Sequence, residues 1–190
     1  DTERAAAELD GNVAALVQKY AMAALTGTGV MIPVGFEHGF RTRLDVVNTY
    51  PDQWEEPSLD LTGAIATLNQ LKARAAIFNQ DGLLYPAKLE GEPNQVRAYV
   101  KRSPDGREKA LFLLNLDREA AQPFHLKSAA DACGIRSLVD LTPGSEPWGL
   151  DGEDLKGELP PSGFRVFLGT MAPPPEAPSA PAELAEATST

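Results

Sequence analysis

Apolar residues near the start of the chain recur with the period of an α-helix. After cap-forming residues at 10–12, they follow the pattern i, i+3, i+4, i+7, i+8 and i+11, at Val13, Leu16, Val17, Tyr20, Ala21 and Ala24. This spacing predicts an amphipathic helix that ends near Gly27. A second helix is predicted after Ser58 or Asp60, which are candidate caps, with its basic residues in the last turns. Its apolar positions are Leu61, Ile65, Leu68 and Leu71, and the basic residues are Lys72 and Arg74.

Between the two predicted helices, the run from Gly29 to Gly35 is almost entirely apolar. A short apolar run bounded by glycines favours a strand buried on both faces of a parallel sheet. Pro33 argues against a regular strand, because proline has no backbone N–H for the sheet ladder. The segment from Gly35 to Pro57 is polar, aromatic and too long for an ordinary connection, which is typical of segments that carry function. The order of these elements predicts an α/β first part.

After about Phe78 the pattern changes to alternation of apolar and polar residues. The apolar positions are Val96, Ala98 and Val100, and the positions between them are Arg97, Tyr99 and Lys101. Ser103-Pro104-Asp105-Gly106 has the composition of a turn, and the apolar segment 110–116 follows, so we expect a β-hairpin. Further strands are expected at 122–127, 136–141 and 164–168. The second part should therefore be all-β, an antiparallel sandwich.

Composition and charge exclude several classes of partner. The chain has 190 residues, of which 43% are hydrophobic, and a formal net charge of −10. Without a basic stripe to neutralise phosphates, nucleic acid and anionic membranes are not expected partners. Apolar runs fall short of the roughly 18 residues of a membrane-spanning helix. A complete (β/α)8 barrel needs about 250 residues, so the chain cannot hold one.

The ends of the chain and its cysteine bear on processing and compartment. The sequence begins with Asp1 and shows no signal peptide, so we expect a removed segment or a start inside a longer polypeptide. The proline-rich segment 171–190 is predicted to be a disordered tail or, alternatively, a linker. The single Cys133 excludes an internal disulfide and a cysteine-based zinc site. It favours a reducing compartment, so a cytoplasmic protein is expected, with secretion as the alternative.

Several short motifs resemble the C-terminal part of α-amylase-family glycoside hydrolases. Asp1-Thr2-Glu3-Arg4 precedes an alanine-rich helix, and the run from Gly29 to Glu37 matches the Gly-x-x-x-x-x-Gly-x-Glu pattern of the family's eighth barrel strand. The segments 111–116 (LFLLNL) and 139–144 (VDLTPG) are similar to strands of its C-terminal domain. The resemblance covers residues 1–169. It implies the last units of a (β/α)8 barrel over 1–78, a β-sandwich domain over 79–170, and the tail 171–190.

The resemblance also implies an activity and a set of site residues. Asp1 matches the third catalytic carboxylate of the family, which holds sugar hydroxyls in the transition state. However, the Asn-His that precedes this carboxylate in the family is absent here. Arg4, Glu37, His38 and Trp54 are the candidate substrate-binding residues, and no metal or cofactor is expected. The substrate would be an α-linked glucan or oligosaccharide, with hydrolysis or glucosyl or maltosyl transfer as the reaction.

The same resemblance implies that the chain alone is inactive. Retaining glycoside hydrolysis needs a nucleophilic carboxylate and a second carboxyl that acts as acid and then as base. In the family both come from the fourth and fifth barrel strands, and nothing in this sequence resembles these strands. The missing N-terminal barrel portion is therefore an expected partner, in the same polypeptide or in a complex. The alternative is an autonomous, non-catalytic module that binds glucan or protein. A barrel fragment should expose the run 29–35, whereas a self-sufficient module should cover it.

The candidate residues also have ordinary structural interpretations. Arg4 could pair with Asp1 or lie on the surface, and Glu37 could bond a neighbouring arginine such as Arg41. Trp54, with Tyr50 and Phe40, could stack on sugar rings or pack the long loop onto its scaffold. His125 is expected to point outward into solvent. Trp148 would either mark a surface sugar site or pin its loop. Glu37 and His38 without further ligands are weak evidence for a metal.

Overall fold

The computed structural model describes residues 3–45, 47–92, 94–129, 131, 137–151 and 153–170. Asp1, Cys133 and the segment 171–190 lie outside these residues. The helices are α1 (Ala5–Glu8), α2 (Val13–Thr26) and α3 (Thr62–Arg74), with the 3-10 helices η1 (Phe36–His38), η2 (Pro51–Gln53) and η3 (Ala76–Asn79). The strands are β1 (Leu83–Ala87), β2 (Val96–Arg102), β3 (Glu108–Asn115), β4 (Gln122–Leu126), β5 (Ser137–Asp140), β6 (Leu155–Leu159) and β7 (Phe164–Thr170).

Both long helices predicted from the sequence are confirmed. The Oδ1 atom of Asn12 accepts a hydrogen bond from the backbone N–H of Ala15 at 3.0 Å, which caps α2, and the helix ends before Gly27. The Oδ1 atom of Asp60 accepts one from the backbone N–H of Thr62 at 2.8 Å, where α3 begins. Asn12 is the N-cap residue of α2, whereas Asp60 lies one residue before the N-cap of α3; each bond satisfies a free backbone donor in the first turn of its helix. No helix in the described part of the chain combines the length and apolar character needed to cross a bilayer.

The parallel strand expected between these helices is absent: residues 29–35 form no strand. Met31 is 91% exposed and Val34 48% exposed, and only Val30 packs partly against the core, so the run is not buried as a central strand would be. A central strand needs backbone partners on both sides, and every strand pairing among the described residues is antiparallel and lies in the second part of the chain. Pro33 also removes one ladder donor. The expectation of a parallel sheet is therefore wrong for the described residues.

The second part forms two antiparallel sheets, as the alternating pattern predicts. One has five strands in the order β1-β2-β3-β7-β5, and the other pairs β4 with β6. The expected β2–β3 hairpin is confirmed, and so are strands over most of the other predicted segments. The sequence pattern missed two strands. β1 carries Pro86 and lies at a sheet edge, where proline is tolerated, and Gly157 interrupts the pattern of β6.

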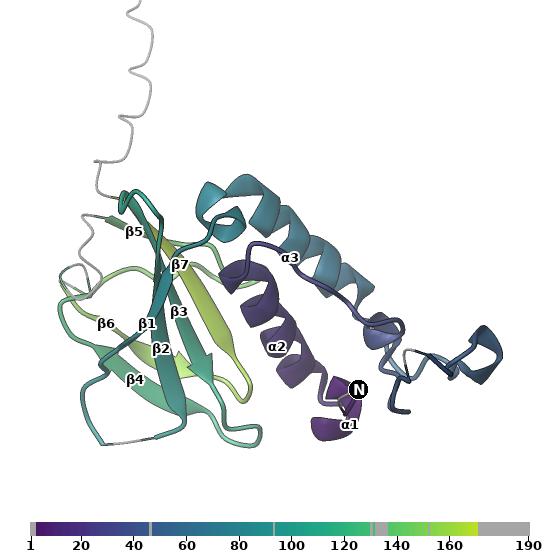
Figure 1. Cartoon of the computed structure of the whole chain (residues 1–190). Helices are drawn as coiled ribbons and strands as arrows, with labels where there is room; N and C mark the ends of the chain where they lie inside the picture. Colours follow the sequence, from purple (N-terminus) through teal and green to yellow (C-terminus); the bar gives the residue numbers. More distant parts are fainter. Residues whose placement is uncertain are drawn as a thin grey trace, which may run out of the picture.

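The elements pack in three layers, with the five-stranded sheet in the middle (Figure 1). Val100 and Leu111 on one face of this sheet pack against Phe124 and Leu155 of the two-stranded sheet. On its other face, Phe112 packs against α2, α3 and η3. β3 is therefore buried on both faces, which explains why its sequence is apolar at consecutive positions. The predicted sandwich lacked the helical layer.

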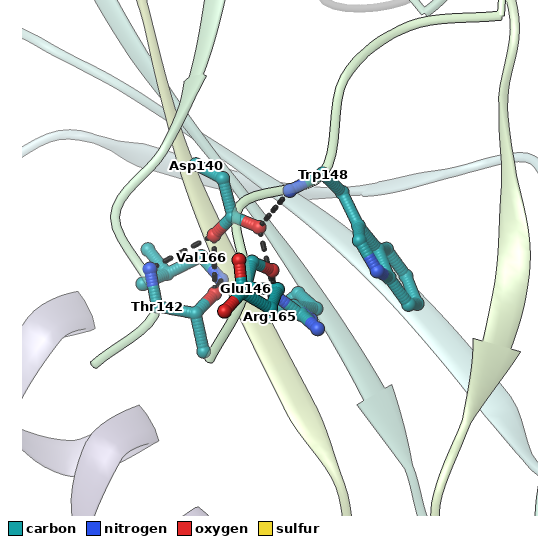
Figure 2. A network of polar contacts seen from close by, with 6 residues as sticks. All are labelled: Asp140, Thr142, Glu146, Trp148, Arg165 and Val166. Atoms are coloured by element: carbon teal, nitrogen blue, oxygen red, sulfur yellow. Dashed lines mark hydrogen bonds and ion pairs between the residues drawn. The ribbon is translucent and has the colours of Figure 1, made fainter. Parts of the chain in front are cut away.

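A buried carboxylate closes the loop that follows β5 (Figure 2). The Asp140 side chain is 1% exposed and bonds the Nη1 atom of Arg165 at 2.9 Å. It also accepts hydrogen bonds from the hydroxyl and backbone N–H of Thr142 and from the backbone N–H of Trp148. The Thr142 hydroxyl oxygen in turn accepts from the backbone N–H of Val166 in β7. Asp140 thus ties this loop to β7.

Lys101 is a buried residue that the alternating pattern placed among the polar positions. It lies on the face of β2 that the helices cover, and it is 1% exposed. Its Nζ atom has no hydrogen-bond partner among the described residues. Burial lowers the pKa of Lys101, the Lys72 ammonium lowers it further, and Asp81 opposes the shift. The fold therefore contains an unsatisfied amine between its helical and sheet layers.

Replacing Lys101 by methionine is expected to raise the free energy of unfolding by about 1–3 kcal/mol at neutral pH, because an unsatisfied buried donor is removed. The unfolded chain binds more protons than the folded chain between the lowered pKa of Lys101 and its ordinary value of 10.5. The stability of the unmodified chain should therefore rise with pH through this window, and the advantage of the variant should shrink. Urea unfolding at pH 7 and pH 10 measures both effects.

The matched control is Lys127→Met, at an exposed position, with an expected change within about 0.5 kcal/mol. A K101M chain that is no more stable than the unmodified chain at pH 7 would contradict this interpretation.

Candidate functional site

The long irregular segment between α2 and α3 is held in place by Arg4. This residue is buried, and its Nε and Nη1 atoms donate hydrogen bonds to the backbone carbonyls of Thr42 at 2.9 Å and Val34 at 2.7 Å. Arg4 thus bridges Val34 and Thr42, which lie in two separate parts of the segment. Among the candidate substrate-binding residues, it is the one whose described contacts organise the surrounding backbone.

Glu55 fixes the same segment from its other end. Its carboxylate accepts hydrogen bonds from the backbone N–H groups of Arg41 at 2.9 Å and Thr42 at 2.6 Å. Burial by itself raises the pKa of the Glu55 carboxyl, but these hydrogen bonds and the Arg4 charge outweigh it, so the pKa lies below its ordinary value. Glu55 therefore remains an anion and holds 41–42 beside Arg4.

Glu37 and His38 lie together in η1, beside the start of α3. The Oε1 atom of Glu37 is 3.9 Å from Nε2 of His38, and both side chains are about one-third exposed. The backbone carbonyl of Glu37 accepts a hydrogen bond from Leu61, just before α3. Arg41, the expected alternative partner of Glu37, instead pairs with Asp10 at 3.2 Å. Both side chains are thus open to a ligand at the surface.

The backbone conformation explains why the second position of the Gly-x-x-x-x-x-Gly-x-Glu pattern, Gly35, is a glycine. Gly35 has φ +83°, in the left-handed region, and a Cβ atom built there would lie 1.9 Å from the ring of Phe40. Phe40 is buried, so its role here is packing. Tyr50 and Trp54 differ, since they are 61% and 53% exposed. Phe36 also packs on the core, so the aromatic side chains of the segment divide into two packing residues and two exposed ones.

Two pockets open on this segment, and Arg4 and Phe40 line both. The first, called the apolar pocket below, has a volume of about 490 Å³ and lies between α2 and residues 30–33. The second, called the Trp54 pocket, has a volume of about 280 Å³ and is lined by Trp54 and polar side chains of the segment 42–55. Of the predicted site residues, the structure brings Arg4 and Trp54 together in the Trp54 pocket. Glu37 and His38 line neither pocket.

The polar side of the Trp54 pocket includes residues that the sequence did not single out. Asp45 accepts hydrogen bonds from the side chain of Asn48 and from the backbone N–H groups of Val47 and Asn48. These bonds lower the pKa of the Asp45 carboxyl, and Arg43 adds to the effect. The Asp-x-x-Asn spacing is a turn signal that could have marked these residues. The pocket therefore presents fixed charges and amides beside an exposed indole.

Trp148 and His125, the two candidate residues in the second part of the chain, both contact neighbouring side chains. Trp148 stacks on Phe124 with ring centroids 5.4 Å apart, and the Arg165 guanidinium lies 4.1 Å from the Trp148 ring centroid. These contacts occupy the indole and favour loop pinning over a sugar platform. His125 points away from the core, but its Nε2 atom lies 2.7 Å from the Asp154 carboxylate. The expected outward position of His125 is confirmed, but its ring is paired with Asp154, the residue directly before β6, and is not surrounded by solvent alone.

Asp154 gives the two-stranded sheet a dependence on acid. A hydrogen bond from the Ser128 backbone N–H, followed by the His125 and Lys156 contacts, lowers its pKa from 3.8 to about 2. Because the folded-state pKa is lowered, this stabilisation is present above the ordinary pKa and lost as the pH falls toward 2. Asp154→Asn should therefore flatten the loss of stability between about pH 5 and pH 2. Thermal unfolding across this range measures the slope, and an unchanged slope would contradict the assignment.

Within the described residues, His, Cys, Asp and Glu side chains form no group of three or more that could hold a metal ion. The polar clusters above are instead satisfied by arginine, lysine and backbone donors.

Comparisons with known proteins give matches in fold. No family model and no curated protein sequence matches the chain. The solved structure of AmyP in complex with maltose superposes with a TM-score of 0.62 at 13% identity, covering 87% of this chain and 37% of that one. The cyclic α-maltosyl-(1→6)-maltose hydrolase from Arthrobacter globiformis gives 0.57 at 21% identity, covering 90% of this chain and 33% of that one. A putative α-galactosidase/melibiase from Bacteroides fragilis gives a TM-score of 0.50 at 14% identity, covering 81% of this chain and 28% of that one.

These matches establish the fold and leave the family open. The chain spans about one-third of the length of AmyP and of the Arthrobacter hydrolase. The structural neighbours are glycoside hydrolases, and the first of them carries maltose. The described fold, mostly antiparallel sheet with few helices, is similar to the part of these structures that it superposes on.

Proposed function

We propose that this chain is the C-terminal portion of an α-glucan-active retaining glycoside hydrolase or glucosyl or maltosyl transferase. The maltose ligand of AmyP and the maltosyl substrate of the Arthrobacter hydrolase support an α-glucan. Both neighbours are about three times as long as the part that this chain covers, which supports a larger catalytic unit. In this proposal, residues 1–78 complete a (β/α)8 barrel, residues 79–170 form the C-terminal domain, and residues 171–190 form its tail.

The run 29–35, exposed at most of its positions, carries the proposal. Met31, Ile32 and Val34 are among the exposed large hydrophobic residues, although their sequence is typical of a buried strand. No backbone hydrogen bond of a sheet satisfies this run in the described residues. An apolar strand sequence without a sheet favours association with further strands, because burial on both faces would satisfy its side chains and backbone together. A self-sufficient module would cover these residues itself.

The candidate site residues take their roles from this arrangement. Asp1 is proposed as the carboxylate that holds sugar hydroxyls in the transition state, and Arg4, Glu37, His38 and Trp54 as substrate-side residues. The surface positions of Glu37, His38 and Trp54 support contact with a ligand, whereas the hydrogen bonds of Arg4 support a positioning role. The nucleophile and the acid/base residue would come from the missing barrel strands. The isolated chain is therefore expected to be inactive.

Activity measurements on the isolated and native proteins test this proposal. The isolated 190-residue chain should release no glucose or maltose from maltotriose and should transfer no glucosyl unit. Native protein immunoprecipitated from its source with an antibody against residues 79–170 should do so. Inactive immunoprecipitates on maltotriose and longer α-glucans would overturn the assignment. Turnover by the isolated chain would overturn the requirement for the missing barrel portion.

The second candidate is an autonomous, non-catalytic module that binds glucan or protein. The three-layer packing favours it, because both faces of the five-stranded sheet are already covered. A cytoplasmic compartment is proposed for either candidate, on the basis of the single Cys133.

A further inference from the structure

The Trp54 pocket has the chemistry of a sugar-binding site. Trp54 is 53% exposed and lines the pocket together with a set of polar side chains. An exposed indole offers an apolar face with a polar edge, which suits the flat apolar face of a pyranose ring. With a volume of about 280 Å³, the pocket is at the lower limit of small-molecule sites, so it suits a single sugar unit.

The charges of the pocket are balanced, which favours a neutral ligand. Its lining contains two carboxylates, Asp45 and Glu55, and two guanidiniums, Arg4 and Arg43. Both carboxylates have pKa values below their ordinary values, so both are anions at neutral pH and face the two guanidinium cations. A phosphate or carboxylate ligand would gain attraction from the arginines and lose it to the acidic groups. A neutral polyol instead finds donors and acceptors together.

The pocket is also built before any ligand arrives. Asp45 is held by three hydrogen bonds from residues 47 and 48, and Glu55 by the backbone of 41–42. The Gln53 side-chain oxygen accepts a hydrogen bond from the backbone N–H of Tyr50 at 2.9 Å, which leaves the Gln53 amide nitrogen available. Groups already fixed by the fold lose little conformational entropy on binding. The bound sugar would therefore meet an ordered set of polar partners.

We propose that the Trp54 pocket binds one neutral glucosyl unit of an α-linked oligosaccharide, stacked on the Trp54 indole. The choice of an α-linked glucan rests on the proposed function above, whereas the neutral sugar follows from the pocket itself. Because its lining residues all belong to this chain, the pocket should bind sugar in the isolated 190-residue protein. This site is a subsite for holding a glucan chain.

The indole N–H signals in an NMR spectrum of the isolated chain test the proposal. The chain has two tryptophans, so the Trp54 and Trp148 signals can be followed separately. Maltotriose should shift the Trp54 signal saturably and leave the Trp148 signal in place. Cellotriose should shift it less, and glucose 1-phosphate should bind no better than glucose.

Two variants make the result specific. Trp54→Ala should weaken maltotriose binding by at least about tenfold, because the stacking surface is lost. Tyr50→Ala is the matched control. Tyr50 is an exposed aromatic residue of the same segment but does not line the pocket, so this variant should bind maltotriose as the unmodified chain does. An unchanged Trp148 signal shows that each variant is folded.

Either of two results would overturn the proposal. One is a Trp54 signal that does not move with maltotriose up to about 10 mM. The other is tighter binding of glucose 1-phosphate, which would identify an anion site. Such a failure is distinguishable from failure of the proposed function, because the activity of the immunoprecipitated native protein is measured independently. Equal binding of cellotriose and maltotriose would retain a sugar site but overturn its α-glucan specificity.

Discussion

Replacing Asp140 by alanine is expected to lower the free energy of unfolding by about 3–5 kcal/mol. The side chain of Asp140 is 1% exposed and pairs with Arg165 at 2.9 Å. Its loss leaves a largely buried guanidinium without its counter-ion and frees the backbone N–H groups of Thr142 and Trp148. The Arg165 guanidinium also packs on Trp148, so the damage should spread to the contact between the two sheets. Urea unfolding of the isolated chain measures the change.

Asp151→Asn is the matched control for this substitution. Asp151 also pairs with a basic residue, Lys156 at 3.7 Å, but its side chain is 82% exposed. An exposed pair contributes little, so the control should change stability by less than about 0.5 kcal/mol. A D140A chain with a loss below about 1 kcal/mol would contradict the role given to the buried carboxylate.

Replacing Met31 by aspartate is expected to have little effect on the isolated chain and a large effect on the native protein. In the isolated chain Met31 is 91% exposed, so stability should change by less than about 0.5 kcal/mol. In the complete barrel the same position would be buried, and an unpaired charge there costs several kcal/mol. The native protein should therefore lose at least about 100-fold of its activity on maltotriose. Urea unfolding and a steady-state assay measure the two effects.

Lys127→Asp, at an exposed position of the second part, is the corresponding control and should leave both properties nearly unchanged. If M31D were harmless in the native protein, the run 29–35 would be a surface there too, and the barrel interpretation would fail. If it unfolded the isolated chain, the run would already be packed.

The sequence predicts elements well where local pattern and tertiary packing agree. The period of the apolar residues and the Asn12 cap suffice for α2, and alternation with a turn suffices for the β2–β3 hairpin. The run 29–35 shows the limit of this reasoning. Its composition is that of a buried strand, but a strand exists only with hydrogen-bonded neighbours, and none is present among the described residues.

Alternation also identifies which residues share a face and says nothing of what covers that face. The alternating pattern correctly places Lys101 on the opposite face of β2 from Val100. Helices pack on that face, so Lys101 is buried although the pattern predicts a solvent-exposed residue there. For the same reason, the continuous apolar pattern of β3 marks burial on both faces, which a two-layer sandwich does not provide.

The candidate site could be predicted only in part. Aromatic and charged residues in a long loop singled out Trp54, and the resemblance singled out Arg4, Glu37 and His38. The sequence could not show that Arg4 binds two backbone carbonyls, or that Asp45 and Glu55 share a pocket with Trp54, because these contacts depend on how the irregular segment folds back on itself. The role of Asp1 stays a prediction, since this residue lies outside the described part of the chain.

The central claim is that these residues belong to a larger α-glucan-active enzyme. The most direct test is the native mass of the protein in extracts of its source, detected with an antibody against residues 79–170. We expect a species much heavier than 20.3 kDa that is no multiple of this mass, since it contains the missing barrel portion. A native species of 20.3 kDa, or an assembly of copies of the 20.3-kDa chain alone, would contradict the claim.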